Sequence, residues 1–363
     1  MLFGCSETDR SANSLFLKNK TARLPEVPFI VLNENNEEIN AYLFYWDLES
    51  KRIKQTSEIV YKISKKTAGQ GKIRMKTQTP ISWDGQKYLV LPDYAEVADK
   101  YAQTVERVKL SSEPRTIWGA YAKLIKSNEK NRYTLTLWDG KKRIEKEVKL
   151  PVYSFKGKDG KEYKTEEYGT VTAIKKTSNG VAMLYPCFTP EEAKLFVVKY
   201  DCVSDRAEWR EIVLPPENGL SPSLPPLADQ TAVIGDSFFI RTLGNPAEVN
   251  VEKASFRTMK NISDIQKKYA SETLRGEFPE YIDVLGSFND ILFISIPMHK
   301  ATGLELYVCA LKNDEIVGLI HRTLNGFDVI DTAGKITASY NIAKSSSLIG
   351  ENDIYLPNLN GMD

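Results

Sequence analysis

One unit returns along most of the chain and constrains its fold more than any other feature: an alternating apolar strand, a turn with Asp or Asn, basic residues, and a second short strand. Alternation with a period of two indicates half-buried β-strands, and a polar turn between two such runs indicates a β-hairpin. These hairpins turn around Asp47, Asp139, Asp201, Asp314 and Asp331. Further strand-like stretches lie between them, at 115–126, 169–177, 231–243 and 281–297. Two hairpins in succession predict a four-stranded antiparallel sheet.

Asp47 and Asp139 lie 92 residues apart, which corresponds to two units of roughly 45 residues, the size of one four-stranded propeller blade. A ring of such blades also hides the sheet edges that one long open sheet would expose. We therefore predict an all-β chain in which residues 25–363 form a single β-propeller of six or seven four-stranded blades. The main rival is a pair of packed β-sandwich domains divided near Gly157 to Gly169.

Turns with the sequences YWDLESKR, LWDGKKR and IDTAGK resemble those of β-propeller repeat proteins loosely grouped with the WD and NHL repeats, and the resemblance covers nearly the whole chain. The chain departs from the eukaryotic WD-repeat scaffold, because no Gly-His start is paired with Trp-Asp in each repeat. The resemblance implies that ligands meet the loops that lead into the innermost strands.

Those loops contain residues of the kinds found in binding hot spots, where aromatic and arginine side chains are common. The candidate ligand-binding residues are Arg115, Trp118, Tyr168, Asp229 and Tyr281. Structural roles also fit them, Trp118 as a core aromatic and Arg115 as half of an ion pair between blades.

Two stretches break the strand pattern and have apolar residues at helical spacing. The clearer covers residues 93–110, and the other covers 261–274, where Ser263 is of a type that caps helices. We predict one or two short helices inserted in loops, packed on the rim of the sheets or serving as a lid or a docking helix. The proline-rich stretch 214–230 predicts an extended connection between blades.

The first residues, Leu2-Phe3-Gly4-Cys5, resemble the lipobox of bacterial lipoproteins, in which an apolar, a variable and a small residue precede the lipidated cysteine. A complete signal has an apolar run of about 7 to 15 residues before the cleavage point, so the resemblance implies that the signal peptide has been removed. Residues 1–24 then form a flexible tether, and Cys5 is a lipid anchor without a catalytic role. The alternative is an ordinary N-terminus with an incidental cysteine.

Cysteine and charge content narrow the possible partners. Four scattered cysteines do not form a disulfide framework or a zinc motif. A turn near Glu191 predicts that Cys187 lies opposite Leu195, so Cys187 and Cys202 are not expected to bridge. The net charge is +1, and the basic stretch 123–164 alternates with apolar residues, which is typical of lysine-rich outer strands. We predict no nucleic-acid partner.

Catalytic and cofactor motifs are not evident in the sequence. His299 and His321 are the two histidines, and neither lies in a recognisable motif. Gly71-Lys72 does not match the motif of a phosphate-binding loop, because the motif needs a second glycine at the position of Lys66. No metal site or cofactor is predicted. Paired carboxylates for glycoside chemistry remain possible in a propeller funnel, although no spacing singles out a pair.

The leading hypothesis is a non-catalytic binding or scaffolding propeller of the bacterial cell envelope. It is lipid-anchored and extracytoplasmic, contacts the membrane only through its anchor, and binds a protein, peptide or glycan. A cytoplasmic propeller is the alternative location. One alternative function is a propeller hydrolase or lyase that acts on a polysaccharide or peptide with funnel carboxylates, which buried acids with raised pKa would favour. The other is a purely structural platform, which a large exposed apolar patch would favour.

Overall fold

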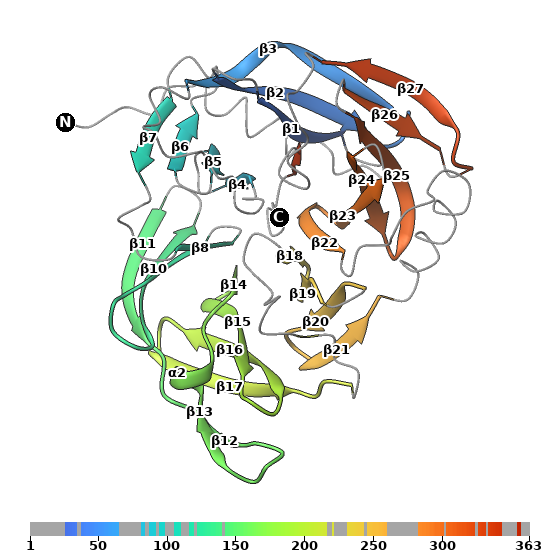
Figure 1. Cartoon of the computed structure of the whole chain (residues 1–363). Coiled ribbons are helices and arrows are strands. Elements are labelled where there is room, and N and C mark those ends of the chain that lie inside the picture. Colours follow the sequence, from blue (N-terminus) through green and yellow to red (C-terminus); the bar gives the residue numbers. More distant parts are fainter. Residues whose placement is uncertain are drawn as a thin grey trace, which may run out of the picture.

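Antiparallel strands make up nearly all of the regular structure in the computed structural model of the chain (Figure 1). The prediction of an all-β chain is therefore confirmed. The structure describes residues 26–34, 38–64, 81–83, 87–91, 94–98, 105–109, 116–119, 122–139, 142–215, 220, 231–242, 245–259, 282–300, 303–323, 326–331, 333–342 and 354–356. Among these, no helix is long and apolar enough to cross a membrane.

Strands that follow one another in the sequence pair with one another, and each of the larger sheets has its own stretch of chain. The N-terminal sheet, which we call the closure sheet, contains β1 (Glu26–Glu34), β2 (Glu38–Asp47), β3 (Arg52–Ser64) and the C-terminal β28 (Ile354–Tyr355) in the order β28-β1-β2-β3. Two four-stranded sheets follow, formed by β4 (Ile81–Trp83), β5 (Lys87–Leu91), β6 (Tyr94–Ala98) and β7 (Val105–Lys109), and by β8 (Thr116–Gly119), β9 (Ala122–Lys126), β10 (Arg132–Asp139) and β11 (Lys142–Lys149).

The second half of the chain continues the same pattern. Two four-stranded sheets are formed by β14 (Ala173–Lys176), β15 (Gly180–Phe188), β16 (Ala193–Asp201) and β17 (Arg206–Ile212), and by β18 (Thr231–Ile234), β19 (Ser237–Ile240), β20 (Ala247–Asn250) and β21 (Ser255–Thr258). A six-stranded sheet contains β22 (Asp283–Phe288), β23 (Ile291–Lys300), β24 (Gly303–Lys312), β25 (Glu315–Thr323), β26 (Gly326–Ile330) and β27 (Ile336–Asn341). Between β11 and β14, the small hairpin β12 (Ser154–Lys156) and β13 (Glu162–Lys164) precedes the short helix α2 (Thr165–Tyr168).

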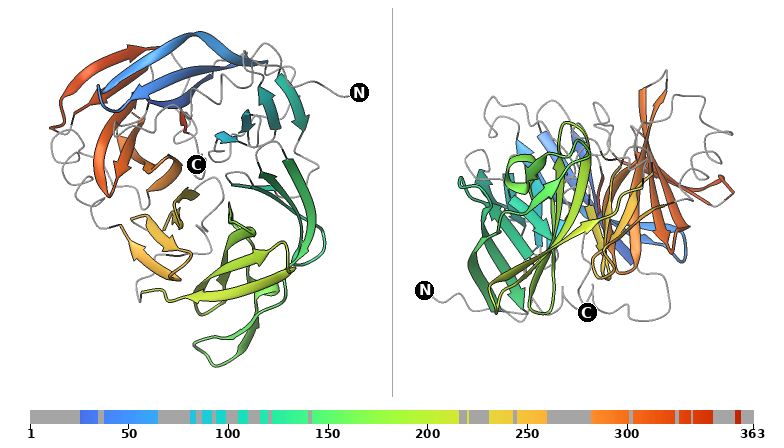
Figure 2. Two further views of the ribbon diagram at one scale, coloured as in Figure 1. Left: turned by 180° about the vertical axis from the view of Figure 1, so that it is seen from behind. Right: turned by 90° about the horizontal axis from the view of Figure 1, so that it is seen from below.

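These sheets follow one another round a common centre in the order of the sequence (Figures 1 and 2). The first strand of each successive sheet, from β4 to β22, lies nearest the centre in Figure 1. The C-terminal strand β28 pairs with β1, so that Val31 lies opposite Ile354 and Ile30 opposite Tyr355. The two ends of the chain therefore share the closure sheet.

Buried apolar side chains gather between consecutive sheets. On β16, Phe196 and Val198 face a cluster shared with β9 and β10, whereas Leu195 and Val197 face a cluster shared with β19 and β20. Two more clusters join the six-stranded sheet to β18–β21 on one side and to the closure sheet on the other. Because both faces of these strands are buried, their sequences are nearly continuous apolar runs, and each buried Val, Leu or Phe contributes about 1.5–3 kcal/mol.

The predicted pair of β-sandwich domains does not agree with this packing. One cluster contains Leu135 of β10 and Met183 of β15, which lie on opposite sides of the proposed division near Gly157 to Gly169. The two halves of the chain therefore share a core at the place where the sandwich alternative separates them.

The five hairpins predicted around aspartate turns are all confirmed, as β2–β3, β10–β11, β16–β17, β24–β25 and β26–β27. Asp201 shows how such a turn is held, because its Oδ1 accepts hydrogen bonds from the backbone N–H groups of Val203 at 2.8 Å and Ser204 at 2.7 Å. Asp47 and Asp331 accept bonds from following backbone amides in the same way. A short side-chain acceptor at the first turn position thus fixes these three turns.

The helix predicted over residues 93–110 is wrong. Residues 94–98 and 105–109 form the strands β6 and β7, which pair with each other, and β6 also pairs with β5. Hydrogen bonds to the neighbouring strand satisfy the backbone, so pairing outweighs the helical spacing of a few apolar residues. The predicted helix over 261–274 lies outside the described residues, as do residues 1–24 and most of the stretch 214–230. The short helix α2 was not predicted.

The predicted register of the hairpin between Cys187 and Cys202 is wrong by one residue. Cys187 lies opposite Lys194, and Gly180 lies opposite Asp201. The turn spans residues 189–192, where the N–H of Thr189 donates to the carbonyl of Glu192 at 2.9 Å, and this places its centre half a residue earlier than expected. Both cysteines are free.

Candidate functional site

The structure describes two of the five residues predicted to bind a ligand. Trp118 lies on β8, the strand nearest the centre in its sheet. Tyr168 ends α2, and its ring packs at right angles to that of Tyr163 at 5.1 Å. These two residues belong to different structural units. The others, Arg115, Asp229 and Tyr281, lie outside the described residues, as does the candidate anchor Cys5.

One ion pair between two sheets is almost completely buried. Arg241 follows the end of β19, Asp283 begins β22, and their side chains, 6% and 1% exposed, are joined at 2.9 Å. The fully buried Ser295 lies opposite Asp283 on β23. Charged groups this deeply buried are stable only when paired. The pair therefore fastens the β18–β21 sheet to the six-stranded sheet.

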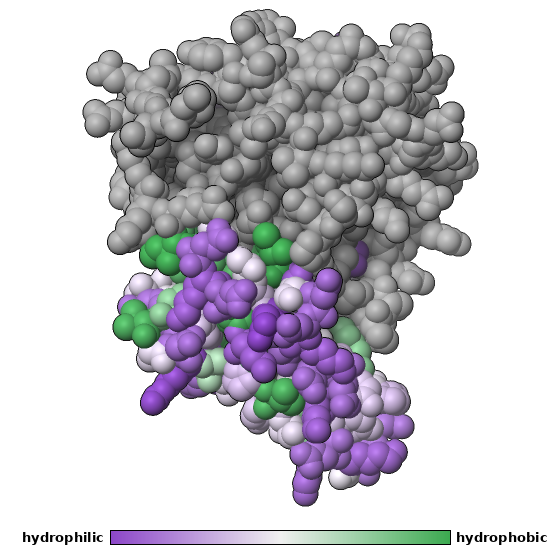
Figure 3. Space-filling model, turned by 90° about the vertical axis from the view of Figure 1, so that its left-hand side faces the viewer, coloured by the Kyte–Doolittle hydropathy of each residue, from purple (hydrophilic) through white to green (hydrophobic). Residues whose placement is uncertain are grey.

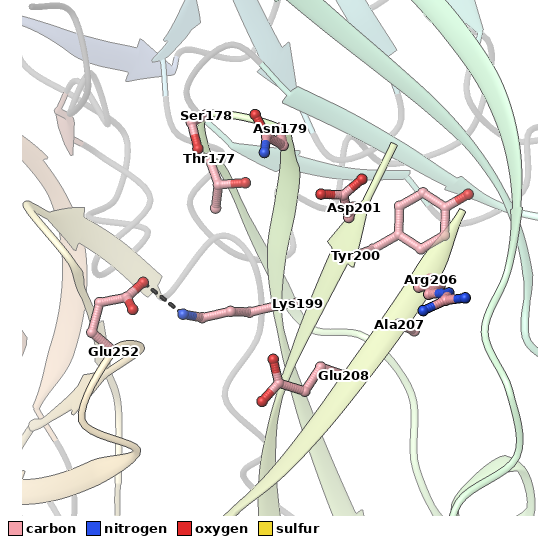
Figure 4. Close-up of a pocket in the computed structure, with 10 residues that line it drawn as sticks. All are labelled: Thr177, Ser178, Asn179, Lys199, Tyr200, Asp201, Arg206, Ala207, Glu208 and Glu252. Carbon is pink, nitrogen blue, oxygen red and sulfur yellow. Dashed lines mark hydrogen bonds and ion pairs between the residues drawn. The ribbon is translucent and has the colours of Figure 1, made fainter. Parts of the chain in front are cut away.

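A polar cleft of about 480 Å³ lies at the opposite end of the β18–β21 sheet, between that sheet and the β14–β17 sheet (Figure 4). Lys199 on β16 reaches across it to Glu252, which lies in the turn between β20 and β21, with Nζ and Oε1 2.7 Å apart. On the wall of the cleft, Lys199 lies opposite Glu208 and Asp201 lies opposite Arg206 on β17. Positive and negative side chains therefore alternate on this wall, both along each strand and between the two adjacent strands.

Most of these charges already have partners. Arg210 Nε donates to Glu208 at 2.7 Å, and its Nη1 donates to the carbonyl of Glu252 at 3.2 Å. The backbone N–H of Ser204 holds the pKa of Asp201 below its usual value of 3.8, with a further contribution from the N–H of Val203. The pKa is also below its usual value at five further aspartates, namely Asp47, Asp159, Asp205, Asp236 and Asp331. Hydrogen bonds and ion pairs to a carboxylate favour its charged form, and here they also hold the charges of the wall in place.

The ion pair across the cleft belongs to a repeated pattern. Lys146 of β11 reaches Asp205 at 3.1 Å, and Arg257 of β21 reaches Asp314. In each case, as with Lys199 and Glu252, the acid lies in the turn between the third and fourth strands of the next sheet. Such partly exposed pairs each contribute about 0.2–1 kcal/mol. The three ion pairs connect successive sheets at the same end of the molecule. The cleft lies at one of them, the pair between Lys199 and Glu252.

We expect the stability of the protein to depend on the ionised carboxylate of Asp201. Because its pKa is lowered on folding, its contribution is fully present above the unfolded value near 3.8 and is lost as the pH falls through the folded value below it. Asp201→Asn keeps the hydrogen-bond acceptor but removes the charge. The urea midpoint of this variant should lie below that of the wild type at pH 7, and the difference should be smaller at pH 3. A difference that is the same at both pH values would contradict this role.

The sequence analysis did not find the cleft or the buried pair. For the buried pair, the sequence offered two signals: Asp283 is a charged residue inside an apolar run, and Arg241 directly follows the apolar strand that ends at Ile240. Among the described residues, no group of three or more His, Cys, Asp or Glu side chains is arranged to hold a metal ion.

Comparisons with known proteins do not assign a family. No protein-family model matches the chain, and no curated protein matches it. Among solved structures, the chain is similar to apo AztD from Citrobacter koseri, with 10% sequence identity and a TM-score of 0.35 over 89% of this chain and 84% of that one. A likeness of this degree assigns neither a fold nor a function.

Proposed function

We propose that the chain is a six-bladed β-propeller that acts as a non-catalytic binding or scaffolding module of the bacterial cell envelope. Six blades correspond to the five four-stranded sheets and the six-stranded sheet, in which β26 and β27 extend a blade outward. Pairing of the C-terminal β28 with the N-terminal β1 supports this assignment, because a ring of sheets needs a closure that joins its first and last strands.

The binding function is supported mainly by one observation: most charged side chains of the cleft are already held in place by neighbouring groups. Lys199, Glu208 and Asp201 are held by neighbouring groups before any ligand arrives, so their positions are fixed and little order is lost on binding. Arg206 is exposed and makes no ion pair with the residues that the structure describes. Its guanidinium is available to an acidic group of a protein or peptide partner.

A photo-crosslinking experiment in the native host tests the binding function. A photoreactive amino acid at Arg206 should give a covalent adduct with a discrete partner, because this position lines the cleft. The matched control carries the same amino acid at Ala333, an exposed residue of the turn between β26 and β27. Identical adducts from both positions, or none from Arg206, would contradict binding in the cleft.

The membrane anchor is a separate part of the proposal and rests on the residues Leu2-Phe3-Gly4-Cys5. We expect the mature protein from its native host to begin at Cys5 and to carry acyl chains, which the mass of its N-terminal peptide will show. A peptide that begins at Met1 with a free thiol would rule out the anchor and favour the cytoplasmic alternative.

A further inference from the structure

We propose that the hairpin formed by β12, β13 and their turn, residues 154–164, is a docking surface for an acidic patch on a partner protein. It projects outward from the ring, at the bottom of Figure 1, and is inserted between two complete sheets. This inference rests on the proposed binding function and assigns part of that function to a surface separate from the cleft.

The hairpin is firmly attached to the ring on its inner face. Phe155 and Tyr163 are each only 6% exposed, and the ring of Phe155 packs against that of Phe196 on β16 at 5.4 Å. The backbone N–H of Lys158 donates to Glu192 Oε1 at 3.0 Å. These contacts hold the hairpin in one orientation, which lowers the entropy lost when a partner binds.

The turn of the hairpin is also preorganised. The hydroxyl of Tyr163 donates to Asp159 Oδ2 at 2.8 Å. Gly160 adopts a φ of +79°, which favours glycine. At Gly157, a Cβ would lie 2.5 Å from the ring of Tyr163, so the backbone approaches the aromatic ring as closely as only glycine permits.

The outward side of the hairpin carries four exposed lysines, Lys156, Lys158, Lys161 and Lys164. In Figure 3, hydrophilic side chains cover the lower part of the coloured surface, where the hairpin projects. Lys161 pairs with Asp159 at 3.1 Å, whereas the other three form no ion pair with any described residue. Elsewhere on the ring, lysines such as Lys146 and Lys199 are paired between sheets. A partner's carboxylates can therefore bind the three lysines without breaking internal pairs.

The chemistry of the hairpin favours an acidic protein surface over other anionic partners. Its aromatic residues, Phe155 and Tyr163, are buried against the ring, so the tip offers no apolar side chain to insert into a lipid bilayer. Glu162 is exposed and lies directly opposite Lys156, and it repels a continuous polyanion such as a nucleic acid. A protein surface that places carboxylates beside a basic group complements this mixed pattern.

Nuclear magnetic resonance with the full chain tests the proposal. The probe is a synthetic glutamate-rich peptide with a single lysine, and we expect it to shift the amide signals of Gly157 and Gly160. The variant K156E/K158E/K164E should bind the peptide at least about tenfold more weakly, which corresponds to about 1.4 kcal/mol. The control K130E/K253E/K335E makes the same change of charge at exposed lysines elsewhere and should bind as the wild type does. Unchanged binding by the hairpin variant would overturn the proposal.

Two competitors distinguish the class of partner. Vesicles of phosphatidylglycerol in phosphatidylcholine and the polyanion heparin are added to the complex with the peptide. We expect both to compete weakly, and tighter lysine-dependent binding of either than of the peptide would overturn the assignment to a protein. The crosslink from Arg206 reports on the cleft independently. A partner captured there, without peptide binding at the hairpin, would end this inference and leave the proposed function intact.

Discussion

Replacement of Ile354 by aspartate is expected to destabilise the protein strongly, although β28 contains only two residues. Ile354 is fully buried in the cluster between the closure sheet and the six-stranded sheet, and it lies opposite Val31. The substitution removes a buried apolar side chain and places a charge without a partner in its position. We expect a loss of about 4 kcal/mol or more in the free energy of unfolding, measured by urea denaturation.

The matched control is Ile336→Asp on β27, where the same side chain is 52% exposed. Its effect should stay within about 0.5 kcal/mol, as is usual for surface positions. Ile354→Ala provides an intermediate case and should cost about 2–5 kcal/mol, because it leaves a cavity without adding a charge. Equal losses for the two aspartate variants would mean that β28 does not close the ring.

The hairpins could be predicted from the sequence because the information that specifies them is local. Asp47, Asp201 and Asp331 each accept hydrogen bonds from amides two to four residues further on. A short acceptor between two alternating runs is therefore sufficient to place a turn. The pairing of β28 with β1 has no such local signal, because Val31 and Ile354 are separated by almost the whole length of the chain.

The error over residues 93–110 has a related cause. Apolar residues at both helical and alternating spacing occur there, and the choice between them depends on whether a neighbouring strand is present. In the structure, β5 provides that strand, since Leu91 pairs with Tyr94 and Tyr88 with Val97. Periodicity within a single segment cannot reveal this partner.

The candidate sites depend on contacts between sheets and were beyond local prediction. Lys199 and Glu252 come from different sheets, and each resembles an ordinary surface residue when read in sequence. Analogy with β-propellers pointed to the loops around Asp229 and Tyr281, which lie outside the described residues. The Arg241–Asp283 pair could not be predicted, because a charge inside an apolar run does not identify its partner.

Removal of one member of that buried pair is expected to have the second large effect. Arg241 and Asp283 are 6% and 1% exposed and 2.9 Å apart. Asp283→Asn preserves the shape of the side chain but removes its negative charge. Since the charge of Asp283 lies 2.9 Å from the guanidinium, we expect its removal to lower the free energy of unfolding by about 3–5 kcal/mol, measured by urea denaturation at pH 7.

A double replacement, R241M/D283L, tests whether the loss comes from the stranded charge or from the ion pair itself. Both charges are then absent and apolar side chains occupy the site, so the double variant should be clearly more stable than Asp283→Asn. Lys199→Met breaks a partly exposed pair and should cost less than about 1 kcal/mol. A double variant as unstable as Asp283→Asn would show that the attraction between the two charges outweighs their desolvation. The pair would then be a stabilising bond between the two sheets in its own right.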